Sequence, residues 1–247
     1  LGNDVVVLST SPFAKGTVNV AAVGGTAATD SDVVFNASAG ATITVDAFDT
    51  VITSAGVKIF GGVGTVKVLA NIIEGSAGND TINASAATVG QGIDGKAGND
   101  VIVGSAFADT ITGGLGGDKM NGGAGADKFV IGNTDSGLVI ASADEITGFV
   151  SGSDTLSLGF VGDATAGTGN YVEAAAAVAD FTAALTAANA ALATLAGTSF
   201  ATELYAVQWD ASNGYLFNDT DGNGTADQVI VLVGITGATF AAADIVA

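Results

Sequence analysis

The sequence predicts a mostly β protein in which the middle of the chain forms a parallel β-roll, a β-solenoid built from short repeats. Three observations favour this class. Short β-branched runs fill the first 73 residues, glycine and aspartate recur every nine residues in the middle, and one Ala-rich segment has helical periodicity. We therefore expect a β-rich segment over 1–73, a β-roll over 74–135, and a small β domain with one helix over 136–247.

The β-rich segment contains seven short apolar runs separated by Gly, Asn, Asp and Ser, at 5–8, 17–20, 33–35, 41–45, 51–53, 57–60 and 65–69. Short strands at close intervals fit either a solenoid or a sandwich. The pattern leaves both architectures open for this segment.

The middle of the chain repeats a nine-residue unit. Four consecutive copies run from 95 to 130, and a fifth begins at Gly75, separated from the array by a degenerate unit (86–94) and two extra residues. The sixth position of each copy is an aspartate: Asp80, Asp100, Asp109, Asp118 and Asp127. The eighth position is apolar and is expected in the core: Ile82, Ile102, Ile111, Met120 and Phe129. A unit of this length is a six-residue loop followed by a three-residue strand, so two units make one coil and the loops alternate between two edges.

This loop chemistry favours calcium. The fourth position of most copies is a glycine that can adopt positive φ and help to aim carbonyl oxygens at one point: Gly78, Gly98, Gly116 and Gly125. A calcium ion takes about 6–8 oxygen ligands, more than one loop supplies, so each ion should lie between two loops on the same edge. We pair Asp80 with Asp100 and Asp100 with Asp118 on one edge, and Asp109 with Asp127 on the other, which predicts about three ions. The alternative is a Gly/Asp-rich array of turns that binds no metal.

One loop departs from the pattern. In the copy that begins at Gly104, Ser105 replaces the second glycine and Phe107 replaces the third. Because a residue with a Cβ does not readily adopt positive φ, we expect the Asp109–Asp127 site to be weakened.

The last part of the chain contains a predicted helix and a predicted β-hairpin or meander. Residues 171–196 place apolar side chains at steps of three or four, and Gly197 is a suitable end for a helix. Strands are expected within 203–235, with a turn over 210–214 in which Asn213-Gly214 is a strong turn signal. The acidic loop in this region matches positions 1, 3, 5, 6 and 9 of an EF-hand loop but has Ile230 at position 12. The candidate ligands are Asp219, Asp221, Asn223 and Asp227, and Gly224 is at position 6. The loop either holds a further calcium ion or is an acidic turn without one.

Composition excludes most other functions. The chain has no His, Cys or Arg, and its 25 acidic and 6 basic residues give a net charge of −19. Histidine- or cysteine-based catalysis and ordinary zinc, copper or haem sites are therefore excluded, and nucleic acid and anionic lipid are repelled. We expect no enzyme activity, no nucleic-acid partner and no transmembrane segment, with Ca²⁺ as the one cofactor. Because Leu1 is not an initiator methionine, we also expect the chain to be part of a longer protein.

The nine-residue unit resembles the RTX (repeats-in-toxin) calcium-binding nonapeptide G-G-x-G-x-D-x-U-x. The resemblance is good over residues 68–160, looser over 161–247 and slight over 1–67. Residues 144–149 and 152–158 resemble the D-x-I-x-x-F and G-x-D-x-L-x-L segments that follow the repeats in serralysin-type proteins. The last four residues, Asp244 to Ala247, resemble the acidic and apolar tail of type I secretion substrates.

The resemblance implies a secreted protein that passes through type I secretion machinery unfolded and folds on extracellular calcium. Composition and the strand-rich lead-in are most similar to the C-terminal part of an RTX-class S-layer (surface-layer) subunit, which would self-associate into a lattice on the cell surface. An RTX adhesin or matrix protein, and the secretion and folding module of an exoenzyme such as a protease or lipase, are the alternatives.

Overall fold

A computed structural model describes most of the chain. It gives the backbone of six short strands within residues 1–60, and residues 71–247 except 76, 86, 88, 166–168, 198–202 and 238; side chains are described from residue 73 onward. The chain divides into two compact units, residues 1–128 and 129–247. Among the described residues, no helix combines the length and apolar character needed to cross a membrane.

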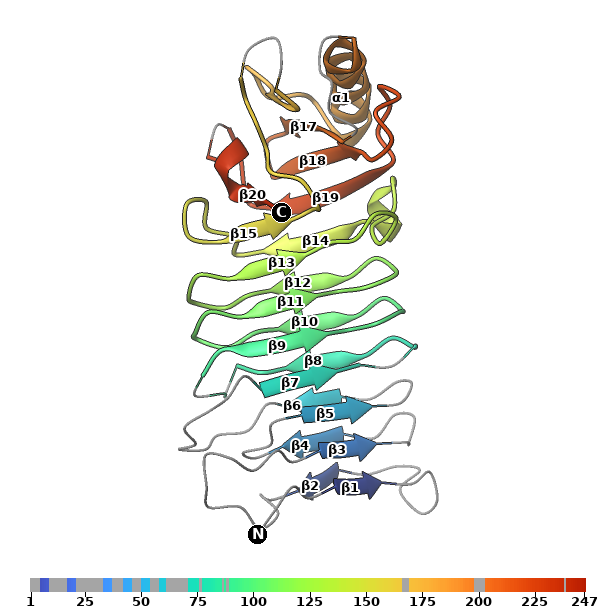
Figure 1. Ribbon diagram of the computed structural model, residues 1–247, viewed down its shortest axis with the longest axis vertical. Helices are drawn as coiled ribbons and strands as arrows, with labels where there is room; N and C mark the ends of the chain where they lie inside the picture. Colours follow the sequence, from blue (N-terminus) through green and yellow to red (C-terminus); the bar gives the residue numbers. More distant parts are fainter. Residues whose placement is uncertain are drawn as a thin grey trace. The chain divides into compact units, whose positions relative to one another are not determined.

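The first unit is a parallel solenoid (Figure 1). Odd-numbered strands form one sheet in the order β1-β3-β5-β7-β9-β11, and even-numbered strands form the other in the order β2-β4-β6-β8-β10-β12. Each coil thus gives one strand to each sheet. The strands are β1 (Val5–Leu8), β2 (Thr17–Val20), β3 (Val33–Asn36), β4 (Thr42–Val45), β5 (Thr50–Thr53), β6 (Lys58–Phe60), β7 (Asn71–Glu74), β8 (Thr81–Asn83), β9 (Gln91–Asp94), β10 (Val101–Val103), β11 (Thr110–Thr112) and β12 (Lys119–Asn121).

The parallel pairing extends through the described N-terminal strands. β1 pairs with β3, β3 with β5 and β5 with β7, while β2 pairs with β4 and β4 with β6, all in parallel. Since a sandwich would pair its strands mainly antiparallel, these strands form a solenoid. The predicted run at 65–69 lies outside the described residues.

The core of the repeats is a ladder of eighth-position side chains, as predicted. Ile102 lies in register with Ile82 on one side and Met120 on the other, and all three are buried. In the opposite sheet Ile111 lies in register with Ile93 of the degenerate unit. Burying a side chain of this size contributes about 1.5–3 kcal/mol to stability. The other two residues of each three-residue strand face outward, so one side chain anchors each strand in the core.

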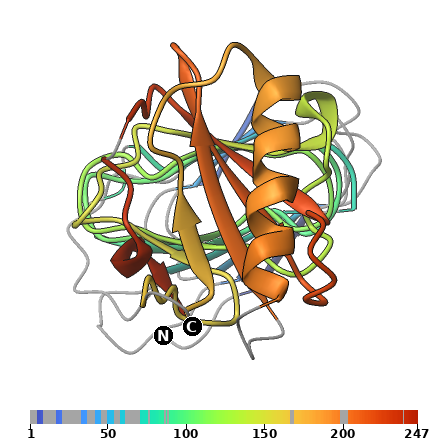
Figure 2. The ribbon, with the colours of Figure 1, turned by 90° about the horizontal axis from the view of Figure 1, so that it is seen from above.

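The second unit has a mixed sheet with one helix packed on it. Its strands follow β13 (Lys128–Val130) at the boundary and are β14 (Asp144–Thr147), β15 (Thr155–Ser157), β16 (Tyr171–Glu173), β17 (Leu204–Trp209), β18 (Asn213–Asp219), β19 (Gln228–Val233) and β20 (Ile245–Val246), with short 3-10 turns at Ile140–Ser142 and Ala242–Asp244. One sheet has the order β16-β17-β18-β19-β14, with an antiparallel β17-β18-β19 meander, and the other has the order β13-β15-β20. Helix α1 (Phe181–Ala196) lies along the larger sheet and buries Ala184, Ala188 and Leu192 against apolar residues that include Leu204, Phe217 and Val229 (Figure 2).

The helix begins ten residues later than predicted. Asp180 has extended backbone and its carboxylate accepts the N–H of Ala183 at 2.9 Å, which makes it the N-cap of α1. The predicted start at 171 is therefore wrong, because Tyr171–Glu173 form strand β16 and pair with Tyr205 to Val207. Pairing with a neighbouring strand outweighs the helical periodicity of these residues.

The hairpin between β17 and β18 turns within the predicted segment 210–214, at its first residues. Gly214 pairs with Trp209, so Asn213-Gly214 begin the second strand and do not form the turn. The turn centres on Ala211 and Ser212, because the Asp210 carboxylate accepts the N–H groups of Ser212 and Asn213 at 2.7 and 2.9 Å. An aspartate turn of this kind competes successfully with the Asn-Gly signal.

Candidate metal centre

The sixth-position residues form two lines in the first unit. The first line is Asp80, Asp100 and Asp118, which precede β8, β10 and β12. The second line is Gln91, Asp109 and Asp127. All six residues are buried. Gln91 occupies the sixth position of the degenerate unit 86–94; extending the nine-residue register through that unit would have identified it.

A backbone hydrogen bond joins each member of a line to the next. The N–H of Asp80 donates to Oδ1 of Asp100 at 2.8 Å, and the N–H of Asp100 donates to Oδ1 of Asp118 at 2.7 Å. In the second line, the N–H groups of Gln91 and Asp109 donate to Oδ1 of Asp109 and Asp127, at 2.6 and 2.9 Å. The structure therefore brings together the three pairs that the spacing predicted. That these pairs bind calcium stays a prediction.

The two extra residues after the fifth copy do not disturb the first line. Ile82 keeps its register with Ile102, although 20 residues separate Asp80 from Asp100 and 18 separate the later pair. The N–H of Ala84 donates to the carbonyl of Val103 and the N–H of Ala87 to the carbonyl of Ala84, at 2.7 and 2.8 Å. The extra length is thus taken up in a local turn after β8.

Glycines let successive loops approach closely. Gly98, Gly116 and Gly125 have φ of 122°, 136° and 132°, as predicted for the fourth position. Gly78 lies against the next loop, because a Cβ on Gly98 would lie 2.6 Å from the Gly78 carbonyl carbon. A Cβ on Gly95, at the first position, would overlap Oδ2 of Asp100. The loops therefore exclude side chains at the points where carboxylate and carbonyl oxygens converge.

The Asp100 carboxylate of the first line is buried among other acidic groups. It is 1% exposed, and its Oδ2 has no hydrogen-bond partner. Burial, together with the charges of Asp118, Asp80 and Asp94, raises the pKa of Asp100 to about 7 despite the hydrogen bond from the Asp80 N–H. A buried carboxylate among other carboxylates requires a proton or a cation. Calcium prefers oxygen ligands, and the buried Oδ2 of Asp100, which has no hydrogen-bond partner, is suited to bind it.

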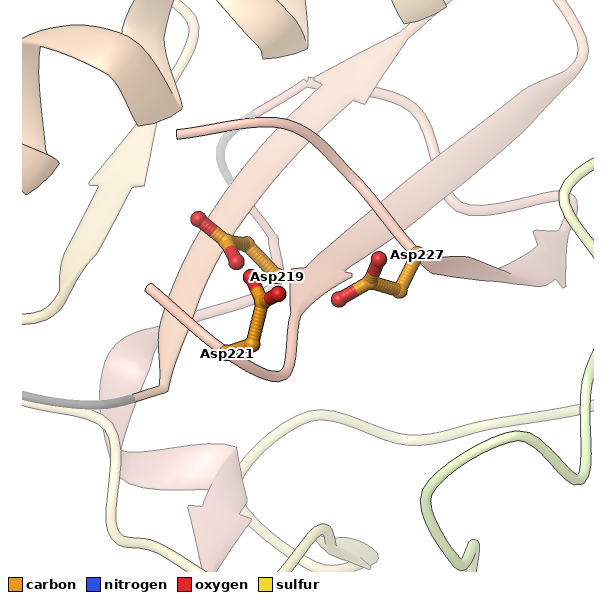
Figure 3. Close-up of side chains that lie close together, drawn as sticks. All are labelled: Asp219, Asp221 and Asp227. Carbon is orange, nitrogen blue, oxygen red and sulfur yellow. The ribbon is translucent and has the colours of Figure 1, made fainter. Parts of the chain in front are cut away.

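The acidic hairpin loop gathers three of its four predicted ligands. Carboxylate oxygens of Asp219, Asp221 and Asp227 lie within 4.8 Å of one another (Figure 3). The buried Asp219 carboxylate accepts the N–H groups of Gly222 and Gly224 at 2.8 and 2.7 Å. Oδ1 of Asn223, the fourth predicted ligand, accepts the N–H of Thr225 at 2.9 Å.

These hydrogen bonds make the hairpin loop self-supporting. Asp227 adds to them, since its Oδ2 accepts the N–H and hydroxyl of Thr220 at 2.8 and 2.7 Å. Loop donors therefore already hold the carboxylates of Asp219 and Asp227. Both predictions for this loop, a further ion and a metal-free acidic turn, remain open.

Comparison with known proteins agrees with the repeat pattern. Residues 69–87 and 94–129 match the family model of the RTX calcium-binding nonapeptide repeat (4 copies). The middle of the chain is therefore an array of RTX calcium-binding nonapeptide repeats. Among solved structures, the chain is similar to the AlgE6R3 subunit of the mannuronan C5-epimerase from Azotobacter vinelandii, with 23% identity, a TM-score of 0.45, and coverage of 75% of this chain and 84% of that one. No curated protein sequence matches the chain.

Proposed function

We propose that this chain is a calcium-dependent extracellular structural protein, the C-terminal part of an S-layer subunit exported by type I secretion. The observation that carries the proposal is the continuity of the solenoid. The strand-rich segment continues into the nonapeptide repeats through parallel pairs, β5–β7–β9 in one sheet and β6–β8 in the other. A continuous elongated scaffold with calcium sites in its loops suits a structural role in a surface lattice.

Composition supports the same role. Without His, Cys or Arg the chain lacks the usual catalytic and phosphate-binding side chains, and its net charge of −19 suits divalent cations as partners. Calcium, when bound, supplies the positive charge that the buried carboxylates lack. The loops around Asp80, Asp100 and Asp118 would hold the ions and order successive coils, so that binding free energy becomes folding free energy. Extracellular calcium modules work with dissociation constants of about 10⁻⁴–10⁻³ M, which would keep the repeats unfolded inside the cell.

The position of the C-terminal tail supports export before folding. Ile245 is buried and pairs with Leu156 of β15, and the Asp244 carboxylate accepts the Ser151 hydroxyl and the Gly152 N–H at 2.6 and 2.9 Å. A secretion apparatus that reads this tail can reach it only while the second unit is unfolded. Export must therefore begin before the second unit folds, and calcium-driven folding of the repeats outside the cell would then make it irreversible.

The proposal is tested by adding calcium to the chelated chain and following assembly by electron microscopy. Two-dimensional sheets that form with calcium and dissolve in chelator are the expected result. A matched variant, Asp100→Asn, should need more calcium to form them. A chain that binds calcium and folds but stays monomeric at high concentration contradicts the lattice role and favours the adhesin or exoenzyme-module alternatives.

A further inference from the structure

The loop Gly104–Asp109 has a different backbone from its neighbours. At the second position, Lys96, Gly114 and Gly123 have φ of 79°, 100° and 96°. Lys96 therefore accepts a left-handed conformation that is unfavourable for a side chain with a Cβ. Ser105 and Phe107 occupy the second and fourth positions of the Gly104–Asp109 loop, and neither has positive φ. This loop, which joins β10 to β11, therefore follows a different backbone path from the other loops of the array.

The second-position N–H shows where the paths diverge. In two regular loops this group points to the side chain just before the loop: Lys96 N–H donates to Asp94 Oδ1 at 3.0 Å, and Gly123 N–H to Asn121 Oδ1 at 2.8 Å. The corresponding residue before the Ser105 loop is Val103, which has no side-chain acceptor. The Ser105 N–H instead turns inward and donates to Oδ2 of Asp109 at 2.6 Å.

The Ser105 hydroxyl completes this inward arrangement. Its Oγ lies 2.9 and 3.1 Å from Oδ1 and Oδ2 of Asp109, and it accepts the N–H of Phe107 at 3.1 Å. Oδ1 of Asp109 also accepts the Gln91 N–H at 2.6 Å. Both oxygens of this buried carboxylate therefore have protein donors, whereas Oδ2 of the equally buried Asp100 has none.

We infer that Gly104–Asp109 is a calcium-independent turn in which Ser105 takes the place of a cation at Asp109, so that the ions of the repeats bind only along Asp80, Asp100 and Asp118. This inference rests on the proposed calcium binding of the repeats and changes its stoichiometry. The sequence predicted a weakened calcium site between Asp109 and Asp127, and we now expect no calcium ion there. The second line also starts with the neutral Gln91, so it carries one carboxylate fewer than the first. One side of the coils is then held by protein hydrogen bonds and the other by metal.

Calcium counting in matched variants tests this inference. Bound calcium per chain is measured by equilibrium dialysis with radioactive calcium and by calorimetric titration, with circular dichroism in saturating calcium to show that each variant is folded. Asp100→Asn should lose at least one ion per chain, and Asp109→Asn should lose none. The double variant Ser105→Gly with Phe107→Gly restores the repeat pattern and should gain one ion.

Ser105→Ala covers the case in which Asp109→Asn does not fold. It keeps the Asp109 carboxylate and removes only the hydroxyl, so its ion count should equal or exceed that of the wild type. A lower count in Ser105→Ala or in folded Asp109→Asn, or no gain in the double glycine variant, overturns the inference. A wild-type chain that binds no calcium would instead defeat the proposed function, which separates the two failures.

Discussion

The buried carboxylate of Asp100 in the nonapeptide repeats and that of Asp219 in the helix-bearing unit have different hydrogen-bond partners. In the repeats, Asp100 is buried beside other carboxylates and keeps an oxygen without a hydrogen-bond partner. In the second unit, the buried Asp219 carboxylate accepts N–H groups from its own loop, and α1 and the meander bury large apolar side chains such as Leu192 and Phe217. The second unit therefore contains its own stabilising interactions, whereas in the proposed function the line of Asp80, Asp100 and Asp118 in the repeats depends on a cation supplied from outside.

Calcium removal should have the largest effect, and it should fall on the repeats. Chelator is expected to remove most of the β signal that the first unit gives in circular dichroism, because the facing carboxylates then repel one another. The emission of Trp209, the one tryptophan in the chain, should change little, because this side chain is buried in β17 of the second unit. Magnesium in place of calcium is the control. Loss of both signals together would mean that both units need calcium to stay folded.

Two glycines with positive φ provide the next test. Gly152 in the second unit has φ of 79° and open space where a Cβ would lie, so Gly152→Ala should cost only roughly 1–2 kcal/mol of unfolding free energy. Gly116 has φ of 136°, and a Cβ there would overlap the Gly98 carbonyl of the neighbouring loop. Gly116→Ala should therefore cost at least about 3 kcal/mol and raise the calcium concentration needed for folding. Denaturant unfolding in saturating calcium measures both, and equal costs would contradict the close loop packing.

A smaller effect is expected from pH in the absence of calcium. Burial and the charges of Asp118, Asp80 and Asp94 raise the pKa of Asp100 to about 7, compared with about 3.9 in an unfolded chain. Between these values the folded state holds a proton that the unfolded state has released. Stability of the calcium-free repeats therefore falls as pH rises through this window.

The β signal of the chelated chain in circular dichroism, followed between about pH 5 and about pH 8, measures this dependence. The repeats should be most stable at the acidic end, and Asp100→Asn should flatten the profile. Stability that rises with pH over this range would show that Asp100 is not held among uncompensated carboxylates.

The smallest effect should come from the exposed ion pairs of Lys96. Its Nζ lies 2.6 Å from Asp94 Oδ2 and 3.4 Å from Glu74 Oε1, on side chains that are about a third or more exposed. Lys96→Gly loses these weak pairs but relieves the positive φ, so the unfolding free energy in calcium should change by less than about 1 kcal/mol. A larger loss would indicate that Lys96 supplies part of the charge compensation assigned to calcium.

Periodicity predicted the repeats well because a strict period determines both the core and the neighbours of each loop. Once Ile102 and Met120 share a core position, Asp100 and Asp118 must lie on the same line. The inward turn of the Ser105 N–H could not be predicted in the same way. The Ser105 N–H donates to Asp109, a choice of acceptor on which the repeat period carries no information.

Competition between local signals limited prediction in the second unit. The periodic pattern of 171–196 is helical throughout, but Tyr171–Glu173 find a strand partner in β17, and Asp180 caps the helix only after that strand ends. Likewise, the Asp210 carboxylate determines the hairpin turn that Asn213-Gly214 would otherwise form. The first outcome depends on a tertiary partner that the sequence pattern does not identify, and the second depends on a local side-chain hydrogen bond that competes with the Asn-Gly signal.

The most direct measurement is amide hydrogen exchange of the whole chain with calcium and with chelator, resolved by peptide. If calcium orders the repeats, peptides that cover β8, β10 and β12 should lose protection in chelator by several orders of magnitude, while peptides that cover β17, β18 and α1 keep theirs. Protection of β8, β10 and β12 that is the same in calcium and in chelator would contradict a calcium-dependent fold.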